Sequence, residues 1–172
     1  MQISTETVSP PGNPNLRNHE FTMSVLMTPD TANFSGNVHG GTVLKLLDQV
    51  AYACASRYCG RYAVTVSVDQ VMFRQPIHVG ELVTFLASVN STGNTSMEIG
   101  IKVVAENLQT QVKRHANSCI FTMVAVDEQR KPVLVPPWVP ITAEQVKRHL
   151  AAQIRRLIRK EYEARLNVVN VA

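Results

Sequence analysis

The sequence predicts an α+β fold, with a five-stranded antiparallel sheet wrapped around one long central helix and a second helix at the C-terminus. Two patterns indicate this fold. Residues 43–55 are apolar on nearly every side of a helix, which is typical of a buried helix. The segments that follow change to an alternation of apolar and polar residues, the period of strands that bury one face. A single helix next to such strands is expected to bury itself against their sheet.

Five segments are expected as strands. The clearest is Thr95–Glu106, where every second residue is apolar. In Tyr62–Phe73, the valines at 64, 66 and 68 are expected on one buried face. The four strands that follow the helix are expected to form a meander, because Pro, Gly and Asn residues separate them. The expected strands are His19–Leu26, Tyr62–Phe73, Glu81–Asn90, Thr95–Glu106 and Lys113–Asp127.

The central helix follows a run of turn residues, PDTANFSGNVHGG, at positions 29–41. Gly40 and Gly41 allow the backbone to turn tightly into the helix, and Gly60 is placed to end it. Asp48 lies in the middle of the apolar stretch. A carboxylate in a buried helix is costly to leave ionised and unpaired, so Asp48 is a candidate functional residue.

The 172 residues are most simply one domain with two tails. Residues 1–16 are expected to be a flexible arm, 17–140 the folded domain, and 141–172 a basic amphipathic helix and tail. No apolar run is long enough for a membrane span, and the first residues lack the apolar core of a secretory signal. The three cysteines have no metal-type spacing and are expected to be reduced, in a cytoplasmic protein.

The basic charge is concentrated in the C-terminal helix. Between Glu144 and Arg165, seven basic and three acidic residues leave +4, which equals the net charge of the whole chain. The domain itself is therefore neutral, and its charge indicates no nucleic-acid partner. Apolar residues recur at steps of three and four from Val146 to Tyr162, opposite the basic ones. We expect this helix to dock against an oligomer, and binding to nucleic acid or to an anionic membrane is the alternative.

Five pieces of the chain together resemble the hotdog-fold acyl-CoA thioesterases, in particular the bacterial cytosolic acyl-CoA hydrolase group. They run in family order from Met27 to Asp127. Singly, a short piece such as HGG is a weak signal, but five at the family spacing form a strong one. The pieces are PDTANFSGNVHGG, LLDQVAYACASR, VTVSVDQVMFRQPIHVGE, NSTGNTSMEIGIKV and RHANSCIFTMVAVD.

The resemblance implies a helix surrounded by a sheet, with a pair of such domains as the minimal active unit and a trimer of dimers as the common assembly. Asp48 matches the family's aspartate on the central helix, and Asn33 matches the upstream asparagine. The resemblance implies that these two residues face one active site from different protomers. It also implies that CoA is held by Thr65, Val66 and Ser67 and by Asn94, Thr95 and Ser96. Arg114 is a further candidate for a CoA phosphate, because phosphate attracts arginine.

The chemistry of these residue types suits thioester hydrolysis. Asp48 can act as a general base or as a nucleophile. Asn33 can orient water or polarise the thioester carbonyl, although an asparagine before glycine is also common as a turn residue. Gly40 or Gly41 can donate a backbone N–H to the thioester oxygen, the alternative being a plain tight turn. For His39 we favour a structural or pocket-lining role.

The predicted function is hydrolysis of acyl-CoA to a free fatty acid and CoA, a step of fatty acid metabolism. No metal or organic cofactor is expected, since CoA is part of the substrate and the product. Two other functions stay open. One is a non-catalytic acyl-CoA sensor, which would not need a base such as Asp48. The other is a hotdog dehydratase, whose chemistry usually depends on a histidine.

Overall fold

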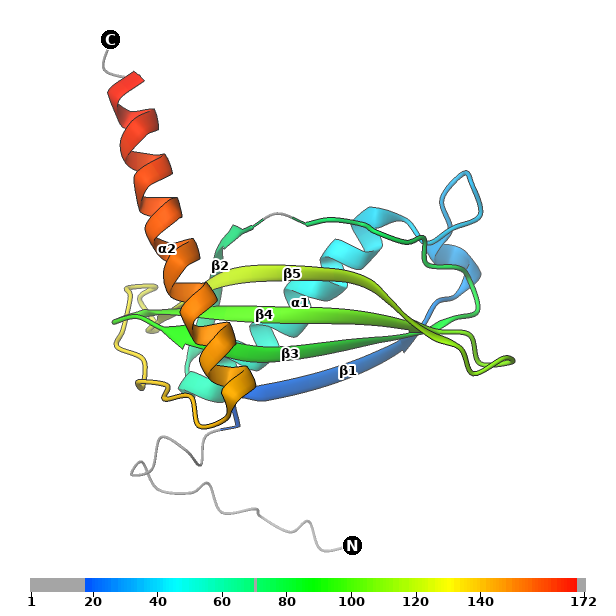
Figure 1. The fold of residues 1–172 in the computed structure, drawn as a ribbon, viewed down its shortest axis with the longest axis horizontal. Coiled ribbons are helices and arrows are strands. Elements are labelled where there is room, and N and C mark those ends of the chain that lie inside the picture. The colour runs from blue at the N-terminus through cyan, green and yellow to red at the C-terminus, as the bar shows by residue number, and fades with distance from the viewer. Residues whose placement is uncertain (1–17, 70, 170–172) are drawn as a thin grey trace, which may run out of the picture.

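The computed structural model describes residues 18–69 and 71–169 (Figure 1). It shows a five-stranded antiparallel sheet, a long central helix and a C-terminal helix, which confirms the predicted fold class. The flexible arm predicted for residues 1–16 lies outside the described residues. The elements are β1 (Glu20–Leu26), a 3-10 turn η2 (Pro29–Thr31), α1 (Gly40–Cys59), β2 (Tyr62–Val68), β3 (Leu82–Thr92), β4 (Ser96–Glu106), β5 (Lys113–Val126) and α2 (Ala143–Val169).

The strand order in the sheet is β1-β3-β4-β5-β2. Only β3, β4 and β5 form a meander, so the prediction of a four-stranded meander after the helix is wrong. The connection through residues 69–81 is too long for a hairpin loop. It carries the chain from β2, at one edge next to β5, to β3, which pairs with β1 and β4 (Figure 1). Among the described residues, the other edge of β2 is therefore unpaired.

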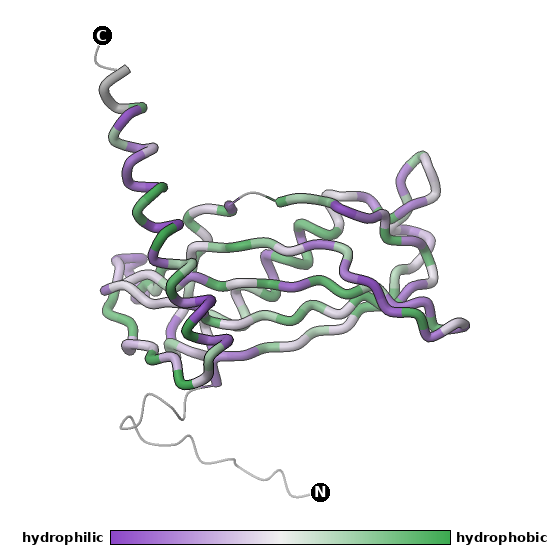
Figure 2. Tube along the Cα trace, viewed as in Figure 1, coloured by the Kyte–Doolittle hydropathy of each residue, from purple (hydrophilic) through white to green (hydrophobic). Residues whose placement is uncertain are grey.

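α1 packs lengthwise against the concave face of the sheet (Figure 1). The helix begins after His39 and ends at Gly60, which takes the left-handed conformation with φ of 67°. One face of α1 joins the hydrophobic core with side chains such as Phe85, Phe121 and Met123. Apolar residues line this interface along both elements (Figure 2). The buried residues of α1 are Val43, Leu47, Val50, Ala51, Cys54, Ala55, Tyr58 and Cys59.

The opposite face of α1 is exposed, so the prediction of a helix buried on every side is wrong. Leu44, Asp48 and Tyr52 recur at steps of four and lie on this face. A single sheet can cover only one side of a helix, and nothing within residues 18–69 and 71–169 covers the other side. Leu44 and Tyr52 are 39% and 40% exposed. The apolar residues on this face are typical of a surface that meets a partner.

β2 contains a bulge that changes which side chains face the helix. The pairing with β5 shifts between Thr65 and Ser67, which leaves Val66 as the extra residue. Thr65 and Val68 lie beside α1, whereas Ser67 and Asp69 contact α2. The three valines of this strand therefore do not share one buried face as predicted, and Val66 is 62% exposed. Strand β2 also ends at Val68, several residues before the predicted end.

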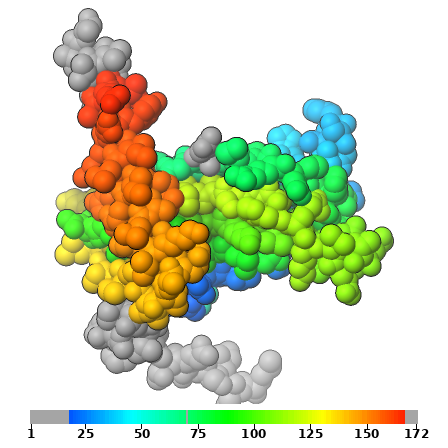
Figure 3. Space-filling view, in the orientation of Figure 1, coloured from blue at the N-terminus to red at the C-terminus, as the bar shows by residue number. Residues whose placement is uncertain are grey.

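α2 crosses the outer face of the sheet with its basic side inward (Figure 3). Arg148 donates to Ser88 at 3.0 Å, Arg155 forms two hydrogen bonds with Glu98, and Arg159 contacts Asp69 at 3.2 Å. The apolar residues at 146, 150, 154, 157 and 158 are exposed on the other side. Docking of the apolar side against another copy of the chain stays a prediction.

No helix within residues 18–69 and 71–169 combines the length and apolar character needed to cross a membrane.

Candidate active site

Asp48 lies on the exposed face of α1, where its carboxylate is held by a neighbour from β2. The Thr65 hydroxyl donates a hydrogen bond to Asp48 Oδ1 at 2.6 Å. The same hydroxyl lies 3.3 Å from the Met123 sulfur, which belongs to the core. The bulge that follows Thr65 allows this residue to face α1 while Ser67 faces α2. A bond to one oxygen leaves Oδ2 of Asp48 available to a ligand.

Two open cavities meet at Asp48. The first, of about 470 Å³, is mainly apolar and lies toward the N-terminal end of α1. The second, of about 370 Å³, lies toward the C-terminal end and includes the Tyr52 and Tyr62 rings, whose centroids are 5.5 Å apart. The first is lined by Leu44, Asp48, Val68, Asp69, Val71 and Phe121. The second is lined by Asp48, Gln49, Tyr52, Tyr62, Ala63, Val64, Thr65 and Met123. A substrate can thus reach the carboxylate from two sides.

Asn33 lies in the loop between η2 and α1. Its Oδ1 accepts hydrogen bonds from the backbone N–H groups of Ser35, at 2.9 Å, and Asn37, at 3.1 Å. The turn role that local sequence favours is therefore present. These two donors also fix which side-chain atom is oxygen. The amide Nδ2 donates to no acceptor within the described residues, so it remains a hydrogen-bond donor that the turn holds in place.

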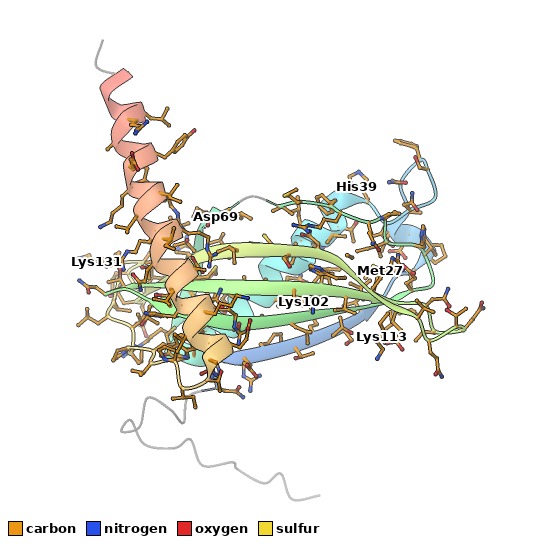
Figure 4. All side chains as sticks on the ribbon, in the orientation of Figure 1. Met27, His39, Asp69, Lys102, Lys113 and Lys131 are labelled. Atoms are coloured by element: carbon orange, nitrogen blue, oxygen red, sulfur yellow. The ribbon has the colours of Figure 1, made fainter. Side chains whose placement is uncertain are left out.

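His39 is the N-cap of α1 (Figure 4). Its Nδ1 accepts the Gly41 N–H at 3.0 Å, which agrees with the structural role that we favoured. The Gly41 donor is therefore already used. Gly40 borders a cavity of about 310 Å³ together with Asn33, Phe73 and Arg74, and it is the remaining candidate of the glycine pair for contact with a ligand.

The structure does not bring Asn33 and Asp48 together within one chain. The cavity at Asn33 shares no lining residue with the two cavities at Asp48. A site that uses both side chains must therefore draw them from two chains, or the loop must move. The first arrangement needs no change in a loop that its own hydrogen bonds hold in place.

The six residues expected to bind CoA lie in two places. Thr65 holds Asp48, Val66 is exposed at the edge of β2, and Ser67 contacts Arg159 at 3.5 Å. Asn94 and Thr95 lie in the turn between β3 and β4, and Ser96 begins β4 in a cavity beside α2. The role of Thr65 as a hydrogen-bond partner of Asp48 was not predicted. No local sequence pattern could indicate it, because it depends on the bulge.

Arg156 is a basic residue that the sequence did not single out. Its guanidinium shares a small cavity with Ser96, and a Cβ placed on Gly93 would lie 3.2 Å from it. No carboxylate pairs with it among the described residues. The basic character of α2 was visible in the sequence, but the orientation of the helix on the sheet was not.

Arg114 has a structural role in the chain. It donates to both carboxylate oxygens of Glu81 and, at 2.6 Å, to the Pro76 carbonyl. Glu81 is buried, and its pKa is lowered mainly by the hydrogen bond from Arg114. With its guanidinium engaged in this way, Arg114 is a weaker candidate for a CoA phosphate than Arg156.

All three cysteines are buried. Burial raises the pKa of Cys54 to about 12 and that of Cys119 to about 11, so both are protonated thiols at neutral pH. In the described part of the chain, no three His, Cys, Asp or Glu side chains cluster as metal ligands would.

Comparison with known proteins places this chain in one family. Residues 35–111 match the thioesterase superfamily. The chain is 52% identical to protein VdlD of Helicobacter pylori over 137 residues, covering 80% of this chain and 78% of that protein. It is 36% identical to the uncharacterized acyl-CoA thioester hydrolase YkhA of Bacillus subtilis, covering 77% of each.

Among solved structures, an apo-hexameric acyl-CoA thioesterase superposes with a TM-score of 0.82 at 34% identity. The match covers 85% of this chain and 94% of the other. The sequence relatives match most of the length of this chain, and the solved thioesterase structure shares its fold. The chain belongs to the thioesterase superfamily and has its hotdog fold.

Proposed function

We propose that the protein is a cytoplasmic acyl-CoA thioesterase, which hydrolyses acyl-CoA to a free fatty acid and CoA. The observation that carries the proposal is the Asp48 carboxylate, held by Thr65 at the junction of two cavities. The names of similar proteins support the substrate class, since they include acyl-CoA thioester hydrolases and a cytosolic one from Rattus norvegicus.

In the proposed reaction, Asp48 acts as a general base on water or attacks the thioester directly. Thr65 occupies Oδ1, so Oδ2 faces the reacting atoms. In the water route, water adds its oxygen to the thioester carbon, the C–S bond breaks, and the CoA sulfur leaves and takes up a proton. In the direct route, the Asp48 carboxylate displaces the CoA sulfur to form a mixed anhydride, which water then hydrolyses to the free acid and the original carboxylate. The water route needs one proton to pass through Asp48, and neither route needs a metal or organic cofactor.

Asn33 and Gly40 are the proposed donors to the thioester oxygen, from the partner chain. Within one chain these groups lie in a different cavity from Asp48. The open edge of β2 and the uncovered apolar face of α1 support a two-fold dimer, since both need covering. We further propose a trimer of such dimers, because a similar thioesterase is hexameric.

The substrate has an apolar end and a charged end, and the surface offers a place for each. The cavity lined by Leu44, Val68 and Phe121 suits the acyl chain. CoA is proposed to follow Thr65 to Ser67 and Asn94 to Ser96, with Arg156 as a phosphate partner. Three other arginines of α2 are engaged with the sheet, so these three are not available to bind nucleic acid.

Release of free thiol from acyl-CoAs of increasing chain length tests the proposal. Asp48→Ala and Asn33→Ala should each lower turnover by about a hundredfold or more. Lys45→Ala, on an exposed position of the same helix, is the matched control and should leave turnover unchanged. Wild-type turnover that survives Asp48→Ala would overturn the mechanism. Tight CoA binding without turnover of any acyl-CoA would indicate a sensor.

A further inference from the structure

We propose that Phe34 of each protomer packs against the Tyr52–Tyr62 pair of its partner, and so places the adjacent Asn33 beside the partner's Asp48. The proposal rests on the shared site put forward above and adds the contact that aligns its two halves.

Among the described residues, Phe34 is the most exposed of the large apolar side chains, with a relative exposure of 112%. It belongs to the loop between η2 and α1, which projects at the upper right of Figure 1. Burial of this ring against a second copy of the chain would therefore be favourable.

The loop that carries Phe34 is well braced. Asn33 N–H donates to the Asn37 carbonyl at 2.6 Å, and Gly36 N–H donates back to the Asn33 carbonyl at 3.0 Å. Asn37 also bonds the His78 ring at 2.8 Å, which ties the loop to the segment before β3. Because these bonds hold the turn, Phe34 and Asn33 form one preformed unit. Docking of the ring therefore determines where the Asn33 amide lies.

The receiving surface lies in the cavity of about 370 Å³ that borders Asp48. Tyr52 and Tyr62 are 40% and 54% exposed, and their rings meet edge to face at 61°. A third aromatic ring adds favourably to such a pair at centroid distances of about 5 to 7 Å. Tyr52 is one helical turn beyond Asp48 on the same face of α1, so the aromatic pair and the carboxylate are adjacent.

Two-fold symmetry selects this cavity over the one near Leu44. Pairing of the open β2 edge with a second β2 about a two-fold axis makes the two α1 helices antiparallel. The loop before the partner's α1 then lies over the C-terminal half of this α1. If the partner's Asn33 meets Asp48, its Phe34 points onward to Tyr52. The apolar cavity at Leu44 stays open for the acyl chain.

Cross-linking tests the contact without using catalysis. The Phe34→Cys/Tyr62→Cys chain, treated with a short bismaleimide, should form a covalent dimer on a denaturing gel. The native cysteines are buried, so background labelling is low. Phe34→Cys/Leu44→Cys probes the other cavity, and Phe34→Cys/Leu134→Cys probes a distant exposed site. Equal or greater dimer yield in either control pair, or no dimer in the first, would overturn the proposal.

A functional measurement distinguishes a role of Phe34 in positioning Asn33 from a role in dimer affinity alone. Phe34→Ala should raise the dimer dissociation constant about tenfold or more, and it should lower kcat even at concentrations where the dimer is saturated. Phe34→Tyr should restore both. Leu134→Ala, which removes another exposed apolar side chain, should change neither. A normal kcat in the saturated Phe34→Ala dimer would overturn the positioning role. Cross-linking without any acyl-CoA turnover would instead contradict the proposed function and leave the contact intact.

Discussion

The two long helices pack against the sheet through opposite kinds of side chain. α1 buries Leu47, Val50 and Cys54 against the concave face and exposes Asp48. α2 turns Arg148, Arg155 and Arg159 toward the outer face and exposes its aliphatic residues. Both helices have one buried and one exposed side in the structure, but only α1 docks through apolar residues.

The difference is explained by the surface that each helix meets. The concave face supplies apolar side chains such as Phe85 and Phe121, whereas the outer face under α2 supplies Ser88, Glu98 and Thr122. Buried polar groups need partners, and arginines provide them. A helix therefore docks by matching its partner surface, and the side left over is available for other molecules. On α1 that remaining side carries the candidate site.

The strongest test of this comparison uses two adjacent residues of α1. Asp48→Asn should reduce acyl-CoA turnover by about a thousandfold while changing the free energy of unfolding by less than about 0.5 kcal/mol. Leu47→Ala, one residue earlier on the buried face, should cost about 3 kcal/mol of stability. Steady-state kinetics and chemical denaturation measure the two effects. A large loss of stability in Asp48→Asn would mean that Asp48 contributes to the packing of α1 and does not lie on an exposed face.

Removing Arg114 from the Glu81–Arg114 pair would measure how much one buried ion pair adds to the free energy of unfolding. That value is a reference for the ion pairs under α2. Arg114→Met should cost about 3 kcal/mol at neutral pH, because it leaves Glu81 buried without its main partner. Arg114 lowers the pKa of Glu81. The pair's contribution is thus present above the usual glutamate range and is lost as pH falls through the lowered pKa.

Denaturation at about pH 7 and about pH 4 should therefore show a smaller difference between wild type and Arg114→Met in acid. Lys113→Met is the matched control, since Lys113 pairs with Glu106 at the surface and should matter little at either pH (Figure 4). A difference that grows in acid would contradict the assignment.

The orientation of α2 is tested by substituting one residue on each side of the helix, in separate variants. Arg155→Met should cost about 2 kcal/mol, because Glu98 would stay buried without its ion-pair partner, and Asn90 would be its remaining side-chain hydrogen-bond partner among the described residues. Leu157→Ser, on the exposed side, should change the unfolding free energy of the chain by less than about 0.5 kcal/mol. The reverse order would show that α2 docks through its apolar side.

The smallest expected effect concerns Thr65. Thr65→Ala removes the hydrogen bond to Asp48 and should lower kcat about tenfold, whereas Thr65→Ser keeps the hydroxyl and should stay near wild type. Val64→Ala, at the preceding position, controls for changes in β2 packing. Equal losses in the alanine and serine variants would show that the hydroxyl does not position Asp48.

The sequence was sufficient for the elements that depend on local patterns. Alternation located β3, β4 and β5, and Gly40 and Gly60 marked the ends of α1 closely. The bulge at Val66 and the place of β2 next to β5 depend on pairing with distant residues, so no local pattern could indicate them. The same non-local cause explains why the orientation of α2 was missed.

For the site, the sequence identified Asp48 and Asn33 as candidates, but for partly wrong reasons. Asp48 was singled out as a buried carboxylate, and it is exposed within the chain. Asp48 is a candidate site residue because of the face of α1 on which it lies. Thr65 was assigned to CoA and Arg114 to a phosphate, but their hydrogen bonds to Asp48 and Glu81 form only in the folded chain.

Mixing two inactive chains tests most directly whether the active site is shared. Asn33→Ala and Asp48→Ala chains, coexpressed in equal amounts, should form mixed dimers in about half of the cases, each with one complete site. The mixture should then recover about a quarter of wild-type acyl-CoA turnover, far above either variant alone. Activity no greater than the sum of the two variants, in dimers shown to be mixed, would contradict the account.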